Sequence, residues 1–386
     1  MKVLSLFSGI GAFEKALDVL KIPYELVGFS EIDKYAVKSY CAIHNVPETM
    51  NLGDITKIDE KALPKDIDLI TYGFPCQDIS LAGKQKGLFN EDGTKTRSGL
   101  FFEAFRIIEE TQPKVAIAEN VKNLAGKKFN AQFQVVLASL EAAGYNNYWQ
   151  VLNSKDYGIP QNRERVFIVS VRKDVDNVTF KFPKAVPLEL RLKDMIEDKV
   201  DKKFYLSNAQ IDNLKKRLGE TLTNKSGLKE INMIGMLDIK GNEQVRRVYG
   251  TDGISPTLNT MQGGNRQPKI LVEVAAYDEQ NSYIRKDGCV GTLTTDGSTP
   301  KHNNRVVEVY EEKIAGIAPT VKNYYIRKLT PKECFRLMGF TDDDFAKAEA
   351  VNSNSQLYKQ AGNSIVVDVL VHIFTNLLKT NDFKGA

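Results

Sequence analysis

A cysteine that could act as a nucleophile stands in the stretch Gly73-Phe74-Pro75-Cys76-Gln77. The stretch follows the apolar run Ile67–Tyr72, which has the composition of a buried strand. Because Pro75 restricts the backbone where a strand should give way to a loop, we expect the Cys76 thiol to face a cleft. A cysteine becomes a strong nucleophile only as a thiolate, so its neighbours decide whether it reacts.

The other cysteines do not indicate a metal site or a disulfide framework. Cys41, Cys289 and Cys334 are far apart, no C-x-x-C pair occurs, and the chain has only three histidines. Cys41 and Cys334 fall on predicted helices, where a free cysteine is usually a small buried hydrophobe. We therefore predict no metal ion and a reducing compartment.

A glutamate could assist a reaction at Cys76. Glu119 follows the apolar run Val115–Ala118, at the carboxyl end of another predicted strand. Ligands of open α/β sheets bind at this edge, which favours a functional role for Glu119. The alternative is an acid that only caps a loop.

Two arginines could supply positive charge to the same cleft. The stretch Gln161-Asn162-Arg163-Glu164-Arg165 leads into an apolar strand, and alternation would place Arg163 and Arg165 on one side together with Gln161. Converging guanidinium groups suit a phosphate or the polar edge of a base. The alternative is a surface ion pair with Glu164.

A glycine-containing loop indicates a nucleotide-like ligand. Phe7-Ser8-Gly9-Ile10-Gly11 lies between a predicted strand and a helix, so backbone amides could approach the ligand. Glu31, just past the next strand, could accept hydrogen bonds from ribose hydroxyls, and Asp54 follows at a further strand end. The simpler interpretation is a tight turn with two solvated acids.

The elements that must position these residues alternate along residues 1–170. The predicted strands and helices are, in chain order, Val3–Phe7, Gly11–Leu20, Tyr24–Phe29, Asp33–His44, Leu69–Tyr72, Leu100–Glu110, Val115–Ala118, Phe129–Ala143 and Val166–Val171. Such alternation predicts a parallel sheet with helices on both faces.

The pattern changes in residues 182–325, which are rich in Gly, Thr, Asn and Pro. One helix is predicted at Asn208–Leu218, and Asp252–Thr260 resembles Asp287–Thr295 as a weak repeat. Short β segments joined by turns fit this region. Helical periodicity returns at Pro331–Met338 and Ile365–Leu378, so one α/β domain is interrupted by a smaller one.

Composition excludes several classes of protein. The 386 residues are 42% apolar and 26% charged, which is ordinary for a globular protein, and the apolar runs are too short for a membrane span. The first residues have the pattern of a strand, not of a signal peptide. A net charge of +4 is too small to indicate a polyanionic partner by itself.

Five of these motifs together resemble a known family. Phe7–Gly11, Gly73–Gln77, Glu119–Val121, Gln161–Arg165 and Gly362-Asn363-Ser364 occur in the order of the motif series of the DNA (cytosine-5)-methyltransferases of bacterial or phage type. The resemblance covers residues 1–180 and about 326–386.

The resemblance implies a fold and a cofactor. The fold is a Rossmann-like mixed sheet of the S-adenosylmethionine-dependent methyltransferases, with helices on both faces and a smaller, β-rich target recognition domain. The implied domains are residues 1–181, 182–325 and a C-terminal segment, 326–386, that completes the catalytic domain. The implied S-adenosylmethionine-binding residues are Phe7, Gly9, Gly11, Glu31, Ile32, Asp54, Ile55, Pro75, Leu100, Asn363 and Ile365.

The resemblance also implies a mechanism on a cytosine flipped out of duplex DNA. Cys76 would add to C6, Glu119 would contact N3, and Arg163 and Arg165 would support the base. C5 would then take the methyl group, giving 5-methylcytosine and S-adenosylhomocysteine.

DNA contacts are implied less clearly, at Gln77, Ser80, Gln85, Arg97, Thr257, Arg266, Thr292 and Arg305. The stretch Leu88–Thr96 is longer than in compact family members, which leaves the residue that fills the flipped base's gap open. Thr257-Leu258, Thr292-Leu293 and Thr320-Val321 all resemble the Thr-Leu/Val element that precedes the family's specificity loop, and sequence alone does not choose among them.

The expected partner is double-stranded DNA with a short recognition sequence, bound by a monomer in the cytoplasm of a bacterium or of a phage-infected host. A cognate restriction endonuclease is a possible companion. Two alternatives are an RNA cytosine methyltransferase of the same fold and a catalytically silent DNA-binding relative. The irregular middle domain favours duplex DNA, and the complete set of Cys76, Glu119 and the two arginines favours an enzyme.

Overall fold

The computed structural model describes residues 1–75, 88, 96, 98–206, 231–237, 239, 243–262, 266–273, 276–278, 283–285, 307–310 and 321–380. The chain forms two compact units. The first unit comprises residues 1–159, 163–188 and 338–386, and the second unit comprises residues 160–162 and 189–337.

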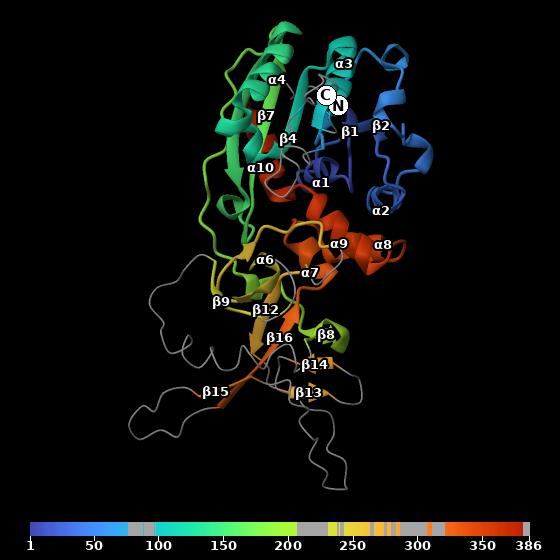
Figure 1. Cartoon of the computed structure of the whole chain (residues 1–386). Helices are drawn as coiled ribbons and strands as arrows, with labels where there is room; N and C mark the ends of the chain where they lie inside the picture. Colours follow the sequence, from blue (N-terminus) through green and yellow to red (C-terminus); the bar gives the residue numbers. More distant parts are fainter. Residues whose placement is uncertain are drawn as a thin grey trace. The chain divides into compact units, whose positions relative to one another are not determined.

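A six-stranded sheet forms the centre of the first unit (Figure 1). Its order is β2-β1-β3-β4-β7-β5; the strands in chain order are β1 (Lys2–Leu6), β2 (Glu25–Ser30), β3 (Leu69–Tyr72), β4 (Val115–Val121), β5 (Tyr145–Asn153) and β7 (Glu164–Arg172). Strands β1 to β4 pair in parallel, so their carboxyl ends meet at one edge. Strand β7 runs antiparallel to both β4 and β5.

The antiparallel strand corrects the all-parallel sheet that alternation predicts. Strand β5, which that pattern omits, is joined to β7 without a crossover helix, through residues 154–163, which begin with the turn Ser154–Tyr157. The two strands therefore pair antiparallel, from Tyr145 opposite Arg172 to Asn153 opposite Glu164. The mixed sheet implied by the family resemblance is confirmed.

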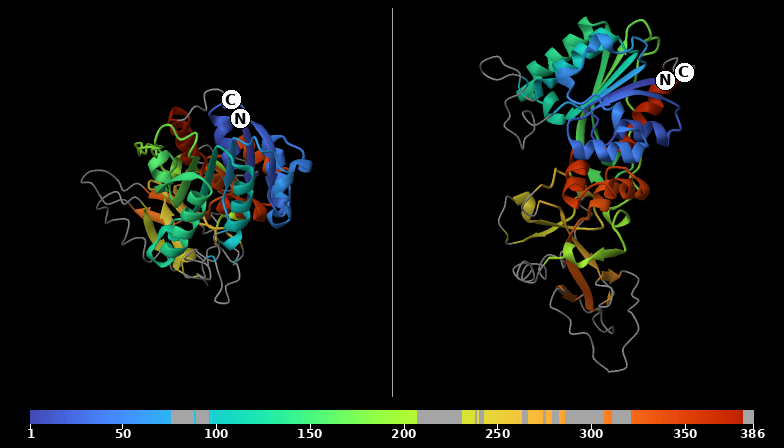
Figure 2. Two further views of the ribbon diagram at one scale, coloured as in Figure 1. Left: turned by 90° about the horizontal axis from the view of Figure 1, so that it is seen from above. Right: turned by 90° about the vertical axis from the view of Figure 1, so that its right-hand side faces the viewer.

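Helices cover both faces of this sheet (Figure 2). They are α1 (Ala12–Val19), α2 (Lys34–His44), α3 (Phe101–Thr111), α4 (Asn130–Ala142) and α10 (Val367–Thr380). Neighbouring residues of the central strands, which point to opposite faces, are both buried: Leu4 and Val3 in β1 are each 0% exposed. A strand buried on both faces needs a helical layer on each side.

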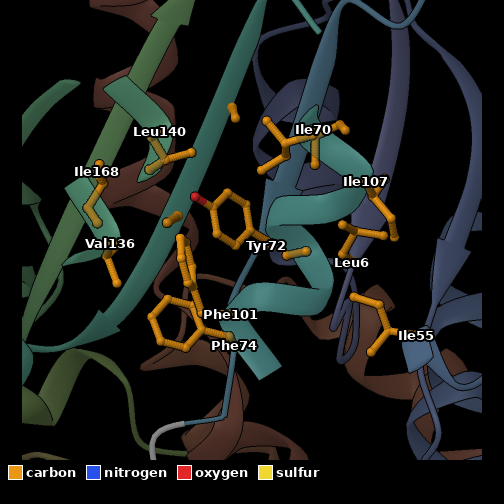
Figure 3. Packing of buried hydrophobic residues seen from close by; sticks show 14 of the residues in the cluster. Leu6, Ile55, Ile70, Tyr72, Phe74, Phe101, Ile107, Val136, Leu140 and Ile168 are labelled. Atoms are coloured by element: carbon orange, nitrogen blue, oxygen red, sulfur yellow. The ribbon is translucent and has the colours of Figure 1, made fainter. Parts of the chain in front are cut away.

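One face packs against α3 and α4 (Figure 3). There Tyr72 and Phe74 lie beside Phe101, with ring centroids of Phe74 and Phe101 5.6 Å apart. Helices α1 and α10 contact each other through Phe13 and Phe374, whose rings meet edge to face at 6.4 Å. Burying these aromatic side chains contributes much of the stability of the unit.

The C-terminal part of the first unit contains α8 (Asp342–Glu349) and α9 (Asn354–Asn363) ahead of α10. The stretch Asn354–Lys379 is long and apolar enough to cross a membrane by length and composition alone. It is two helices separated at Ser364–Val366, and most of it is buried inside the protein. We therefore assign it to the core of the first unit.

The second unit is built from short strands and turns, as predicted for this region. A five-stranded sheet has the order β15-β16-β12-β10-β9, from β9 (Met233–Met236), β10 (Arg247–Gly250), β12 (Lys269–Glu273), β15 (Val307–Tyr310) and β16 (Val321–Lys328). Smaller sheets join β8 (Lys199–Asp201), β13 (Ala276–Asp278) and β14 (Tyr283–Arg285), and β6 (Gln161–Asn162) with β11 (Ser255–Pro256). The helices are α6 (Glu243–Arg246) and α7 (Pro331–Arg336), and the predicted helix Asn208–Leu218 lies outside the described residues.

Candidate active site

The loop Phe7–Gly11 connects β1 to α1 in an unusual backbone conformation. Phe7, Gly9 and Gly11 have positive φ angles of 54°, 58° and 78°. At Gly11 a β-carbon would lie 2.1 Å from His44 Nε2, so only glycine fits there. His44 Nε2 in turn lies 3.1 Å from the carbonyl oxygen of Ile10. The loop Phe7–Gly11 is thus packed against His44 at the N-terminus of α1.

Glu31 lies against this loop. Its Oε2 accepts a hydrogen bond from Gly9 N–H at 2.9 Å, and its Oε1 accepts one from Asp33 N–H at 2.8 Å. Burial raises the pKa of Glu31 above its ordinary value, although the two N–H groups oppose the rise. The carboxylate is therefore fixed at the carboxyl ends of β1 and β2, where nucleotide-like ligands bind in such sheets.

Asn51 links Glu31 to the neighbouring acid and was missed by sequence reasoning. Its Nδ2 donates to the carbonyl oxygen of Glu31 at 3.0 Å, and its Oδ1 accepts from Glu31 N–H at 3.1 Å. The same Oδ1 accepts from Gly53 N–H at 3.0 Å. Asp54 follows directly and caps the turn Ile55–Lys57, accepting from Thr56 N–H. Hydrogen bonds from Thr56 lower the pKa of Asp54. No local pattern distinguishes Asn51 from an ordinary turn residue.

The remaining predicted cofactor residues differ in exposure. Ile32 is 76% exposed beside Glu31, which leaves an apolar surface at the edge of the loop. Ile55 is buried in the core of the first unit, and Leu100 is half-buried at the start of α3. Pro75 lies at the end of the described stretch that follows β3.

Glu119 and Arg165 form a pair at the neighbouring edge. Arg165 Nε lies 3.0 Å from Glu119 Oε1, and the Glu119 side chain is only 12% exposed. Burial raises the pKa of Glu119, while the positive charges of Arg165 and Arg163 oppose that rise. A β-carbon placed on Gly73 would lie 3.7 Å from Glu119 Oε2 and 3.8 Å from Ile365 Cδ1. Gly73, Glu119 and Ile365 therefore meet where β3 ends.

Strand β4 is longer than predicted and includes Glu119. The antiparallel pairing with β7 continues to Val121 opposite Arg165, which extends the strand beyond Ala118. The next residue, Asn120, is 2% exposed and donates from Nδ2 to the carbonyl oxygen of Phe74 at 3.0 Å. Asn120 thus fixes the backbone just before Pro75, a role that its place after Glu119 could have indicated.

The two arginines use their guanidinium groups differently. Arg163 is 3% exposed and donates from Nη2 to the carbonyl oxygens of Gly362 and Ser364, at 3.1 and 2.7 Å. Between these carbonyls lies Asn363, the exposed last residue of α9. Arg165 points to Glu119, as described above.

The prediction that Gln161 shares one strand face with both arginines is wrong. The strand is interrupted at Arg163, because β6 ends at Asn162 and β7 begins at Glu164. Within the second unit, the Gln161 side chain donates to Leu337 O at 2.7 Å and accepts from Leu258 N–H at 3.2 Å. Glu164 pairs with Lys122, so the alternative of an Arg165–Glu164 surface pair is also wrong.

Several predicted site residues lie outside the described part of the chain. They are Cys76, Gln77, Ser80, Gln85, Arg97, Thr292 and Arg305. Thr257 and Arg266 are described, and both are exposed in the second unit. The roles of all these residues stay predictions.

The mixed six-stranded sheet, with a nucleotide-type loop and a Glu–Arg pair at its carboxyl edge, defines an α/β protein of the methyltransferase class. The family model for the C-5 cytosine-specific DNA methylase matches residues 1–379. The chain belongs to this family, and it is a DNA (cytosine-5)-methyltransferase.

Individual proteins agree with this assignment. The orphan methyltransferase M.SPBetaI of Bacillus phage SPbeta is 38% identical over 98% of both chains. The type II methyltransferase M.HhaI of Haemophilus parahaemolyticus is 33% identical, over 100% of this chain and 96% of its own. Among solved structures, the S. pombe Dnmt2 methyltransferase has the same fold, with a TM-score of 0.59 and 18% identity over 98% of both chains.

Proposed function

We propose that this enzyme transfers a methyl group from S-adenosylmethionine to C5 of a cytosine flipped out of duplex DNA, through a covalent bond between Cys76 and C6. One observation carries the proposal: the Glu119–Arg165 pair, 3.0 Å apart, lies beside Gly73, three residues before Cys76. A buried acid and a cation beside a strand end that leads into a Pro-Cys pair suit nucleophilic attack on a polar ring.

The residues at the β1–β2 edge fit S-adenosylmethionine. The carboxylate of Glu31 has lone pairs for ribose hydroxyls while its N–H bonds hold it in place. Exposed Ile32 offers an apolar surface to an adenine ring, and the Phe7–Gly11 loop allows close approach of the backbone. Asp54, Leu100, Asn363 and Ile365 would complete this site. S-adenosylmethionine, when bound, supplies an electrophilic methyl group on sulfonium sulfur.

The protein's own residues would prepare the cytosine. The Cys76 thiolate adds to C6, which makes C5 nucleophilic. Glu119, whose pKa burial raises, holds a proton at N3 and so stabilises the negative charge that addition places on the ring. Arg165 holds Glu119 in position and offsets charge on the carbonyl side of the base. After methyl transfer, loss of the C5 proton and elimination of Cys76 release 5-methylcytosine.

We propose Thr257-Leu258 as the specificity element; Thr292-Leu293 and Thr320 of the other two candidates lie outside the described residues. Gln161 Oε1 accepts from Leu258 N–H, and Thr257 Oγ1 donates to the carbonyl oxygen of Asn162. Both contacts lie one or two residues before Arg163 in the sequence, so this element is joined directly to the catalytic motif. The following segment would read bases, because Gln262 and Arg266 are exposed donors.

The turn that follows Thr257-Leu258 is anchored through Met261. Buried Met261 has a positive φ of 49°, and its N–H donates to Asn259 Oδ1 at 2.7 Å. Met261 Sδ lies 3.9 Å from Cys334 Sγ in α7. An anchored turn with exposed polar side chains is a suitable scaffold for a base-reading loop.

The expected setting is the cytoplasm of a bacterium or of a phage-infected host, where a monomer would act on a short sequence. A companion restriction endonuclease would cut that same sequence. Bisulfite sequencing of DNA treated with the purified protein would identify the target cytosine and the recognition sequence. A companion restriction endonuclease could then be sought by its cleavage of that sequence.

The decisive experiment combines two substrates and a mechanistic trap. Labelled S-adenosylmethionine should label plasmid DNA and not bulk tRNA, and labelling of tRNA alone would contradict the DNA assignment. Duplex DNA with 5-fluorocytosine at the target should form a covalent complex, because fluorine cannot leave as the C5 proton does. Methylation without a trapped complex would contradict the Cys76 mechanism.

A further inference from the structure

Helix α9 is bound to α2 and its N-cap through two adjacent residues, Lys359 and Gln360. Lys359 Nζ lies 2.7 Å from Asp33 Oδ2, and Gln360 Nε2 donates to the carbonyl oxygen of Tyr35 at 2.9 Å. Gln360 Oε1 accepts from Ser39 Oγ at 2.8 Å. These partners follow Glu31 and Ile32 in sequence, so one side of α9 is set against the proposed cofactor edge.

Arg163 binds the C-terminal end of α9. The guanidinium donates to the carbonyl oxygens of Gly362 and Ser364, on either side of Asn363. Carbonyl groups at a helix C-terminus lack intrahelical partners and carry partial negative charge, so a buried cation suits them. Ile365, the next residue after Ser364, lies beside Gly73.

We propose that Arg163 is a positioning residue that orients Asn363 and, through Ser364, Ile365 toward the cofactor. The proposal rests on the proposed function of the site, which it deepens. Arg163 would then act on cofactor binding by fixing one short turn, residues 362–365.

Arg165 provides the matched comparison. It is two residues further along the same motif, but its Nε lies on Glu119 Oε1. The two arginines of one motif would therefore divide the work: Arg163 supports the cofactor side and Arg165 supports the base side. Their loss should separate cofactor affinity from adduct formation.

The test measures binding and adduct formation separately in Arg163→Gln and Arg165→Gln. Titration calorimetry with S-adenosylhomocysteine should give a Kd raised about tenfold or more in R163Q, as expected for loss of charge-assisted hydrogen bonds. In R165Q the Kd should stay within about twofold of wild type, while adduct formation with 5-fluorocytosine DNA slows far more. Arg163→Lys, which keeps the charge but not the fork of donors, should fall between wild type and R163Q.

A wild-type Kd in folded R163Q would overturn the proposal. Thermal melting shows whether each variant is folded. If neither R163Q nor R163K folds, Lys359→Met tests the same proposal, because it removes the ion pair between α9 and Asp33. K359M should raise the Kd several-fold, and an unchanged Kd would overturn the role of the α9 turn. Calorimetry needs no DNA, so a wild-type enzyme that binds S-adenosylhomocysteine but forms no adduct would contradict the proposed function alone.

Discussion

At the scale of single residues, the chemistry depends on which protonation state each group holds. Burial raises the pKa of Glu119, and Arg165 and Arg163 partly oppose the rise. Because Glu119 is proposed to hold a proton at N3, we expect kcat/KM to fall as the pH rises through this pKa. Glu119→Gln should lose about 10²- to 10⁴-fold in rate, because an amide cannot transfer a proton.

The pH profile separates this role from a structural one. E119Q should lack the limb that falls at high pH. Arg165→Gln removes a charge that lowers the pKa of Glu119, so its falling limb should move to higher pH. A limb that stays at the wild-type position in both variants would assign that ionisation to another group.

Cys76, the proposed nucleophile, gives a second prediction at this scale. Cys76→Ser should abolish detectable 5-methylcytosine, because a hydroxyl is a far weaker nucleophile at neutral pH than a thiolate. The Kd for S-adenosylhomocysteine should stay near wild type, because the residues proposed to bind the cofactor at β1 and β2 are unchanged. Turnover near wild type in a methyl-transfer assay would remove the covalent mechanism.

At the scale of elements, the β1–α1 loop depends on one glycine. Gly11→Ala combines a left-handed backbone with a β-carbon 2.1 Å from His44 Nε2. We expect it to destabilise the protein by more than the roughly 1–2 kcal/mol of backbone strain alone, and to weaken cofactor binding. Denaturant unfolding and calorimetry would measure the two effects.

A second glycine isolates the contribution of the contact with His44. Gly144 also has a positive φ, 97°, but a β-carbon there would meet nothing within 4 Å. Gly144→Ala should therefore show only the backbone cost and leave the cofactor Kd unchanged. Equal losses of stability in G11A and G144A would mean that His44 moves aside freely.

Elements with a strong local pattern could be predicted, and those stabilised only by distant contacts could not. Strands β1, β3 and β4 are apolar because both of their faces are buried. Edge strand β5, Tyr145–Asn153, is largely half-buried or exposed, so its sequence lacks an apolar run. Helix α8 is polar, although its Thr341–Asp344 capping box offered a signal.

The site shows the same division. Motif order indicated Glu119 and Arg165, because strand ends of an α/β sheet converge on one edge. The bonds from Arg163 to Gly362 and Ser364 join residues about 200 positions apart, and no local pattern predicts that a guanidinium will bind two backbone carbonyls. Asn51 was missed for the same reason, since an amide side chain that braces a backbone resembles a turn residue.

At the scale of the whole molecule, the second unit has a polar centre as well as an apolar one. Glu333, 0% exposed, accepts from four donors: two nitrogens of Arg327, at 2.6 and 2.8 Å, and the N–H groups of Thr330 and Glu197, each at 2.8 Å. The carboxylate thereby joins β16, the start of α7 and the segment before β8. Such a network is stable only while every donor has an acceptor.

Glu333→Gln tests whether the two units can be weakened separately. The amide puts a donor among four donors and leaves Arg327 as a buried uncompensated cation, which should cost about 3–5 kcal/mol. Because this network lies within the second unit, calorimetric unfolding should show that unit melting earlier. DNA binding should fall, while the Kd for S-adenosylhomocysteine stays near wild type.

The control is Arg327→Met with Glu333→Gln, which removes the buried cation while the amide oxygen still accepts from a backbone N–H, so it should cost less than E333Q alone. A loss of S-adenosylhomocysteine affinity in E333Q equal to its loss of DNA affinity would mean that the units unfold together. The proposed division of labour between a methyl-transferring first unit and a DNA-reading second unit would then hold for chemistry but not for stability.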